Sequence, residues 1–298
     1  MFAARRGLAP VVACYDCGTI FRCPDSGTPY SLLRTYDTFG NEQRWFVSST
    51  SGKRVPAADV CTHCGSWRLR ERGIGIQYIY DECKEHFPHV PIFLFDHTTA
   101  TTYTKANKII KEFNSTKGSI LIGTAMALPY LDQPVALSAI VSLDATRCIP
   151  SWRADEQLFR LLLQLRERSH KEVIVQSRQE SDDLLLYATR GAVERFFDDE
   201  LELREMLNYP PFSNLFLLTW QGSAEAIAQT EKLIKDTLKK VTPAVTGQYY
   251  TNPNSVNSKA VRHCLLRIAN DTNCTQLVDQ LRTLPPQIAI TRNPDRIV

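Results

Sequence analysis

The chain contains two short cysteine motifs, Cys14-Tyr-Asp-Cys17-Gly18 and Cys61-Thr-His-Cys64-Gly65. Two close pairs of thiolates form the tetrahedral ligand set that Zn²⁺ prefers, and the glycine after each pair lets the chain turn back beneath the metal. A single Cys-x-x-Cys motif would also suit redox chemistry, but a second one favours structural zinc. The sequence therefore predicts one zinc ion held by Cys14, Cys17, Cys61 and Cys64.

The two motifs are unusually far apart. There are 43 residues between Cys17 and Cys61, whereas compact zinc modules have roughly 15–20 residues between their cysteine pairs. Residues typical of strands flank a predicted turn at Thr38–Asn41 and continue through Arg44–Val47. We interpret residues 11–70 as a zinc-ribbon insertion that carries an additional hairpin.

The remaining cysteines do not suggest disulfide bonds. The total of nine is odd, and four of the others lie among apolar or helical residues, where buried small side chains are expected. These are Cys83, Cys148, Cys264 and Cys274. The apolar stretch Leu8–Ala13 is too short for a signal peptide, and no segment approaches the roughly 20 apolar residues of a membrane span. We expect a cytoplasmic protein without a membrane partner.

Beyond residue 70, short apolar strands alternate with helices. The strands are predicted at Val90–Asp96, Ile120–Thr124, Leu137–Leu143 and Val173–Gln176. The helices are predicted at Ile76–His86, Thr104–Asn114, Asp155–Arg168 and Asp182–Phe197. This alternation indicates parallel βαβ units, so we expect an α/β domain over residues 71–200.

A second domain is predicted over residues 201–298. The proline-containing break Tyr209-Pro210-Pro211-Phe212 precedes its first strand. Its strands are expected at Leu215–Thr219, His263–Ile268 and Ile288–Thr291, and its helices at Ala224–Lys240 and Cys274–Leu284. The polar stretch Gly247–Lys259 reads as a loop. The order β-α-β-α-β predicts a small α+β domain.

Taken in this order, the motifs resemble the PriA family of primosomal replication-restart helicases. The segments that carry the resemblance are Arg5–Pro10 leading into Cys14, Ile120–Met126 with Asp132 and Pro134 (helicase motif V), Asp144-Ala145, Pro150–Glu156, Val173–Gln176, and Glu202–Arg204 with Tyr209–Phe212. The resemblance covers nearly the whole chain but only the second half of such a helicase. It implies a second RecA-like lobe, reached through residues 1–10, with a zinc-ribbon insertion and a C-terminal α/β domain.

Several positions depart from the family pattern. Of the family's inner zinc site only Cys23 remains, and Pro129-Tyr130 replaces the Lys-Gly of motif V. The motif VI segment, residues 164–171, lacks both glycines, and Lys171 aligns with the final arginine. Lysine lacks the planar fork that stabilises a transferring phosphate. Arg168 is left as the candidate catalytic cation, or as a polar residue near a helix end. Gly123, Thr124 and Asp132 keep the motif V pattern.

The ATP-binding lobe of such a motor is expected to be missing. The sequence contains no GxxxxGK[ST] motif, because Ser51-Gly52-Lys53-Arg54 lacks the upstream glycine and the hydroxyl residue. We therefore expect ATP binding only if an N-terminal lobe is supplied, and no ATP hydrolysis by the chain alone.

The resemblance also implies nucleic-acid contacts. The net charge of +3 permits them without requiring them. The candidates are Arg68, Arg70, Arg72, Lys259 and Arg262, with Trp67 as a stacking residue. Each of these cations is also compatible with an ordinary solvated surface that binds no ligand, and Trp67 is also compatible with a buried position in the hydrophobic core. The family's Gly-Pro-x-Pro-Ala turn is absent near Gly247, which weakens the case for DNA contacts in the C-terminal domain.

Three functions are compatible with this sequence. The first is a DNA-binding module of replication restart that binds branched or forked DNA and primosome or single-strand-binding proteins. The second is the lobe-two half of an active ATP-dependent helicase whose ATP-binding lobe is on another chain. The third is a zinc-ribbon scaffold for protein contacts alone.

Overall fold

The computed structural model describes residues 1–3, 7–24, 28–48, 53–147, 151–179, 181–241, 245, 247–251, 260–269 and 272–295. The chain divides into two compact units. The first comprises Met1–Cys23, Thr28–Ile149 and Asp155–Gly191, and the second comprises Ala192–Val298 with Pro24–Gly27 and Pro150–Ala154. The domain boundaries that the sequence predicts, at residues 10, 70 and 200, stay a prediction. Among the described residues, no helix is both long and apolar enough to span a membrane.

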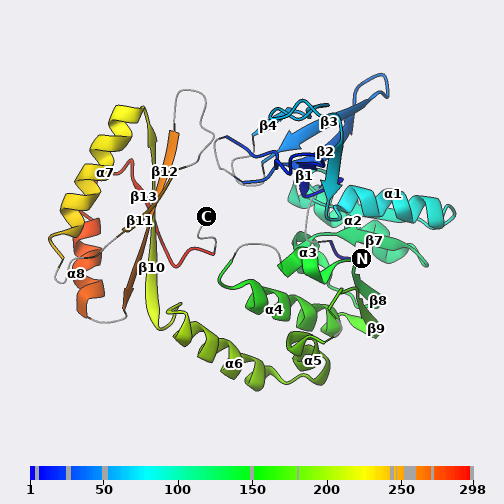
Figure 1. Ribbon diagram of the computed structural model, residues 1–298. Helices are drawn as coiled ribbons and strands as arrows, with labels where there is room; N and C mark the ends of the chain where they lie inside the picture. The colour runs from blue at the N-terminus through cyan, green and yellow to red at the C-terminus, as the bar shows by residue number, and fades with distance from the viewer. Residues whose placement is uncertain are drawn as a thin grey trace. The chain divides into compact units, whose positions relative to one another are not determined.

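The first unit contains a parallel sheet made of two strand pairs (Figure 1). Its strands are β6 (Ile92–Phe95), β7 (Ile120–Gly123), β8 (Val135–Ile140) and β9 (Ser169–Val175). β6 pairs with β7, and β8 pairs with β9. Phe2 bridges Gly123 on one side and Ile140 on the other, and its N–H donates to Ala139 at 2.6 Å. The first residues of the chain therefore supply the link between the two strand pairs.

Helices alternate with these strands. They are α1 (Ile76–His86), α2 (Tyr103–Ser115), the 3-10 helix η1 (Ala125–Tyr130), α3 (Leu143–Arg147), α4 (Ala154–Glu167) and α5 (Asp183–Arg190). The sequence predicts all of them except the two short ones, the 3-10 helix and α3. Helical spacing buries Ile76, Ile79 and Cys83 of α1 against Ile122 of β7. The mixed α/β fold with a parallel sheet is thus confirmed.

One predicted helix is wrong in extent. The stretch Asp182–Phe197 forms two helices, α5 and α6 (Val193–Met206), and α6 continues beyond the predicted end of the helix. Gly191 ends α5 with a φ of 68°, a left-handed conformation that glycine adopts without strain. Leu143, predicted at the end of a strand, begins α3 instead.

The segment before α1 contains two small antiparallel sheets. β1 (Val11–Cys14) pairs with β5 (Leu69–Arg72), and β2 (Ser31–Tyr36), β3 (Glu42–Val47) and β4 (Arg54–Pro56) form a three-stranded sheet. Its core includes Phe21, Tyr30, Phe46 and the fully buried Cys23. Arg34 joins the three-stranded sheet to α1, because its guanidinium contacts the Asp81 carboxylate at 2.6 Å.

The second unit begins with α6 and contains a four-stranded antiparallel sheet with two helices. The order along the chain is β10 (Ser213–Gly222), α7 (Ala224–Leu238), β11 (Gly247–Thr251), β12 (Ala260–Ala269), α8 (Thr272–Leu281) and β13 (Ala289–Arg292). The strands lie in the order β11-β12-β10-β13, which is the split β-α-β-β-α-β arrangement of ferredoxin-like folds. Leu218, Leu266, Ile234 and Leu277 are completely buried between sheet and helices.

The sequence misses one strand of this sheet. β11 lies in the stretch predicted as a loop, where Gln248 and Tyr250 flank Tyr249. Tyr249 packs edge-on against Trp220 of β10, with ring centroids 6.5 Å apart. This contact with a residue distant in the sequence favours the extended conformation over the loop that the polar composition predicts.

Candidate metal centre and nucleic-acid contacts

The two cysteine motifs fold into nearly identical knuckles. Cys14 N–H donates to Thr19 at 2.9 Å, and Cys61 N–H donates to Ser66 at 2.7 Å, so each chain segment returns past its own first cysteine. The turn in each knuckle is made by a glycine, Gly18 or Gly65, with a φ of 72°. A residue with a Cβ is strained in that conformation.

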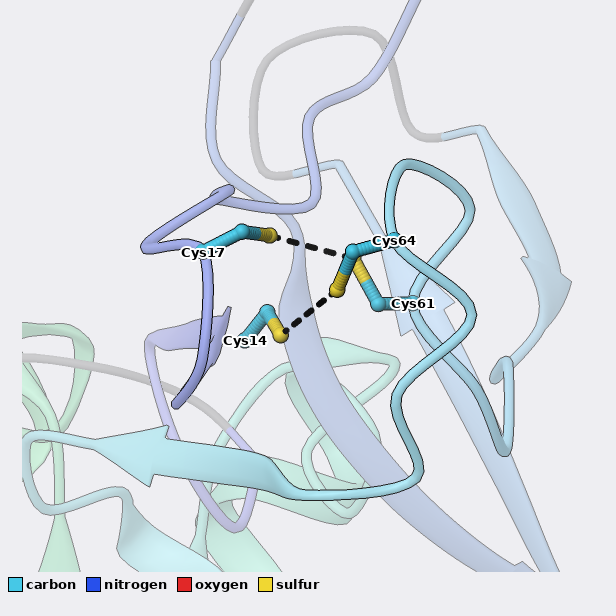
Figure 2. Close-up of side chains that lie close together, drawn as sticks. All are labelled: Cys14, Cys17, Cys61 and Cys64. Atoms are coloured by element: carbon cyan, nitrogen blue, oxygen red, sulfur yellow. Dashed lines mark hydrogen bonds between the residues drawn. The ribbon is translucent and has the colours of Figure 1, made fainter.

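The knuckles bring the four cysteine sulfurs together (Figure 2). All four lie within 4.8 Å of one another, and the Cys14–Cys64 and Cys17–Cys61 sulfurs are each 3.6 Å apart. Tetrahedral zinc with Zn–S bonds of about 2.3 Å separates its sulfurs by about 3.8 Å, so the group fits this metal. Four thiolates leave no open coordination position, which is the pattern of a structural site.

The crowded thiols favour different protonation states. Hydrogen bonding by the side chain and backbone of Thr19 lowers the pKa of Cys17 to about 6. At Cys64 the Ser66 backbone favours the thiolate, but Cys17, burial and the other cysteines outweigh it and raise the pKa to about 12. Without a cation the Cys64 thiol therefore resists ionisation beside Cys17, and a divalent ion would remove this conflict.

Charged and aromatic side chains surround the cysteine site. Asp16 of the first knuckle accepts hydrogen bonds from Ser66 and from the Arg68 guanidinium, which ties the two knuckles together. The guanidinium carbons of Arg68 and Arg70 lie 4.9 and 4.2 Å from the centre of the Tyr15 ring. Tyr15 was not identified from the sequence, where only its position inside a Cys-x-x-Cys motif could have pointed to it.

The predicted nucleic-acid residues lie in different environments. Trp67 is 78% exposed, and Arg68, Arg70 and Arg72 are also exposed, with Arg70 and Arg72 on β5. Arg262 belongs to the second unit, on β12, where it forms an ion pair with Glu231 at 3.2 Å. Lys259 lies outside the described residues.

The predicted motif V residues lie around β7 and η1, and Arg168 of motif VI lies between α4 and β9. Gly123 is buried at the end of β7, and the Thr124 side chain caps η1 by accepting from Met126 N–H at 3.4 Å. Asp132 is exposed and accepts a hydrogen bond from Asn114 at 3.3 Å. The Arg168 guanidinium donates to the backbone carbonyl groups of Leu131 and Gln164, both at 3.3 Å. In this conformation Arg168 therefore binds the chain's own backbone.

A parallel α/β unit that carries a four-cysteine site, followed by a split βαβ unit, is compatible with part of a helicase-type motor. Comparison with known proteins points to one such group. The chain is similar to Replication restart protein PriA of Haemophilus influenzae, with 29% identity over 247 residues, 81% of this chain and 32% of that protein.

Other relatives carry the same name. PriA of Bacillus subtilis is 29% identical over 241 residues, 78% of this chain and 29% of that protein. PriA of Chlamydia pneumoniae is 26% identical over 255 residues, 82% of this chain and 33% of that protein. No protein-family model matches the chain. The resemblance to PriA is confirmed, and the chain spans about a third of the length of the curated relatives it matches.

Proposed function

We propose that the chain is a zinc-containing, DNA-binding component of replication restart, equivalent to the second lobe and C-terminal domain of a PriA-type helicase. The observation that carries this proposal is the four-cysteine cluster, which lies in a sequence similar to replication restart proteins over about 80% of its length. The zinc ion holds the two knuckles together, and the knuckles in turn fix the exposed cations of β5.

The DNA contacts that we propose involve mainly the phosphate backbone. Arg70 and Arg72 form no ion pair among the described residues and are exposed on one strand. Residues two apart on a strand point to the same face, so both guanidinium groups are presented together. Such contacts are sensitive to salt and carry little sequence information, which suits recognition of forked or branched DNA by shape.

We infer that the chain does not hydrolyse ATP alone. No GxxxxGK[ST] motif is present in its 298 residues to cradle the phosphates. Arg168 donates to backbone carbonyl groups, and Lys171 replaces the arginine of motif VI. Primosome and single-strand-binding proteins are the partners that the relatives' role suggests.

A second candidate is one half of an active motor. The chain spans about a third of its relatives, and the motif V pattern is kept by Gly123 and Thr124 at the end of β7 and by Asp132 after η1. In this case a separate chain with the phosphate-binding loop would restore ATP hydrolysis when mixed with this one.

The test combines metal analysis, DNA binding and ATP hydrolysis on one preparation. We expect one zinc per chain, binding to forked DNA that weakens steeply between 50 and 200 mM salt, and no DNA-stimulated hydrolysis. Hydrolysis by the chain alone would overturn the assignment as a non-catalytic component. Zinc without any DNA binding would leave a protein-binding scaffold and would contradict the proposal.

A further inference from the structure

We propose that the two cysteine knuckles present a stacking platform for the unpaired bases of single-stranded DNA, in which Trp67 contacts a base and Arg70 contacts the adjacent phosphate. This inference rests on the proposed function and names the form of DNA that the cysteine site binds.

The first observation is the position of Trp67. Its side chain is 78% exposed, although a large aromatic ring gains stability from burial. The backbone on both sides is fixed, because Ser66 accepts from Cys61 N–H at 2.7 Å and Trp67 accepts from Leu69 N–H at 2.8 Å. An exposed ring on an ordered backbone loses little conformational entropy when a ligand stacks on it.

The second observation concerns the cations beside Tyr15. Arg68 is neutralised by Asp16, whereas Arg70 makes no ion pair among the described residues. The Tyr15 ring holds the Arg70 guanidinium 4.2 Å from its centre. Arg70 is therefore an oriented cation whose charge is free to bind a phosphate.

Together these features favour single-stranded nucleic acid over a duplex. An open indole face can stack only on a base whose own face is free, and in a duplex the bases already stack on one another. Exposed aromatic rings beside cations are the pattern by which proteins bind single strands without sequence preference. The bond between Tyr15 N–H and Arg68, at 2.8 Å, joins the two knuckles, so the platform depends on both cysteine pairs.

The chain offers a matched control aromatic. Phe39 is 89% exposed in the turn between β2 and β3, within the same unit, and no cation lies over its ring among the described side chains. Phe39→Ala removes an equally accessible ring without touching the knuckles.

The experiment measures binding of fluorescein-labelled oligo(dT) and of a blunt duplex of equal length to the wild type and to Trp67→Ala, Trp67→Phe and Phe39→Ala. Trp67→Ala is expected to weaken oligo(dT) binding about tenfold and duplex binding less than about twofold, whereas Trp67→Phe retains most of the affinity. Arg70→Ala is expected to weaken oligo(dT) binding and to reduce its salt dependence. Zinc content is measured for every variant to confirm that the knuckles are intact.

The outcomes separate this inference from the proposed function. If forked DNA binds but Trp67→Ala and Phe39→Ala behave alike, the platform is disproved and the proposed function stands. Equal losses on oligo(dT) and duplex would also exclude base stacking. If no DNA of any form binds to the wild type, the proposed function itself fails.

Discussion

The cysteine module (residues 11–72) and the C-terminal sheet (β10 to β13) differ in how much packing and strand pairing stabilises them. In the module, β1 and β5 pair over four residues, and six described residues of the apolar cluster are buried. In the sheet, β10 and β12 pair over ten residues, and the cluster contains fourteen buried residues. A small core rarely suffices alone, so we expect the module to depend on a bound metal and the sheet on packing.

The largest expected effect is the loss of the metal. Cys14→Ser removes a buried ligand and is expected to abolish stable zinc binding, because structural zinc supplies about 10–16 kcal/mol of apparent binding free energy to a folded module. Hydrogen exchange should then show an unprotected module, while β10 and β12 stay protected.

The matched control is Cys274→Ser, which changes a buried cysteine in the C-terminal cluster. It is expected to keep one zinc per chain and to destabilise only the second unit. If Cys14→Ser leaves the protection of the module unchanged, zinc is not what holds it, and the contrast between the two regions disappears.

A cavity in the C-terminal sheet should destabilise the second unit and leave the cysteine module unchanged. Leu218 is completely buried at the centre of β10, so Leu218→Ala is expected to lower the free energy of unfolding of this unit by about 2–5 kcal/mol without changing zinc content. Leu233→Ala, on the exposed side of α7, should cost less than about 0.5 kcal/mol. Urea unfolding of the three proteins checks this, and equal effects of the two substitutions would contradict it.

The elements that the sequence predicts well are those whose pattern is local. The helix Ile76–His86 and the strand Ile120–Gly123 follow from their own periodicity, and the cysteine spacing alone predicts the four sulfurs that the structure brings together. Residue contacts at long range explain the failures. β11 pairs with β12 and packs Tyr249 on Trp220, and no pattern within residues 247–251 indicates either contact.

The same limit applies to the candidate site. Alternate spacing would place Arg68, Arg70 and Arg72 on one face of a strand, but in the structure Arg68 precedes β5 and is neutralised by Asp16. Likewise, the sequence indicates a surface cation at Arg262, whereas the structure shows that Arg262 forms an ion pair with Glu231. The partner of a charge lies far along the chain in both cases, 52 and 31 residues away, so the charge pattern alone cannot distinguish a free cation from a paired one.

The smallest expected effect is a pH dependence confined to the C-terminal sheet. Burial lowers the pKa of His263 below its ordinary value near 6.5, and its Nδ1 lies 3.0 Å from the Thr219 hydroxyl. The unfolded chain therefore binds the proton more readily than the folded one. The contribution to stability is complete above pH 6.5 and is lost as the pH falls from 6.5 through the folded pKa.

Urea unfolding of the wild type and of His263→Gln between pH 5.5 and 7.5, with zinc in excess, measures this effect. The glutamine keeps a polar group beside Thr219 but does not titrate, so the difference between the two proteins isolates His263 from all shared groups. Glu231, whose pKa is lowered by Lys235 and Arg262, titrates below this range. We expect the wild type to lose stability relative to the variant as the pH falls. A constant difference would show that the His263 proton does not distinguish the folded from the unfolded sheet, and that packing alone sets its stability.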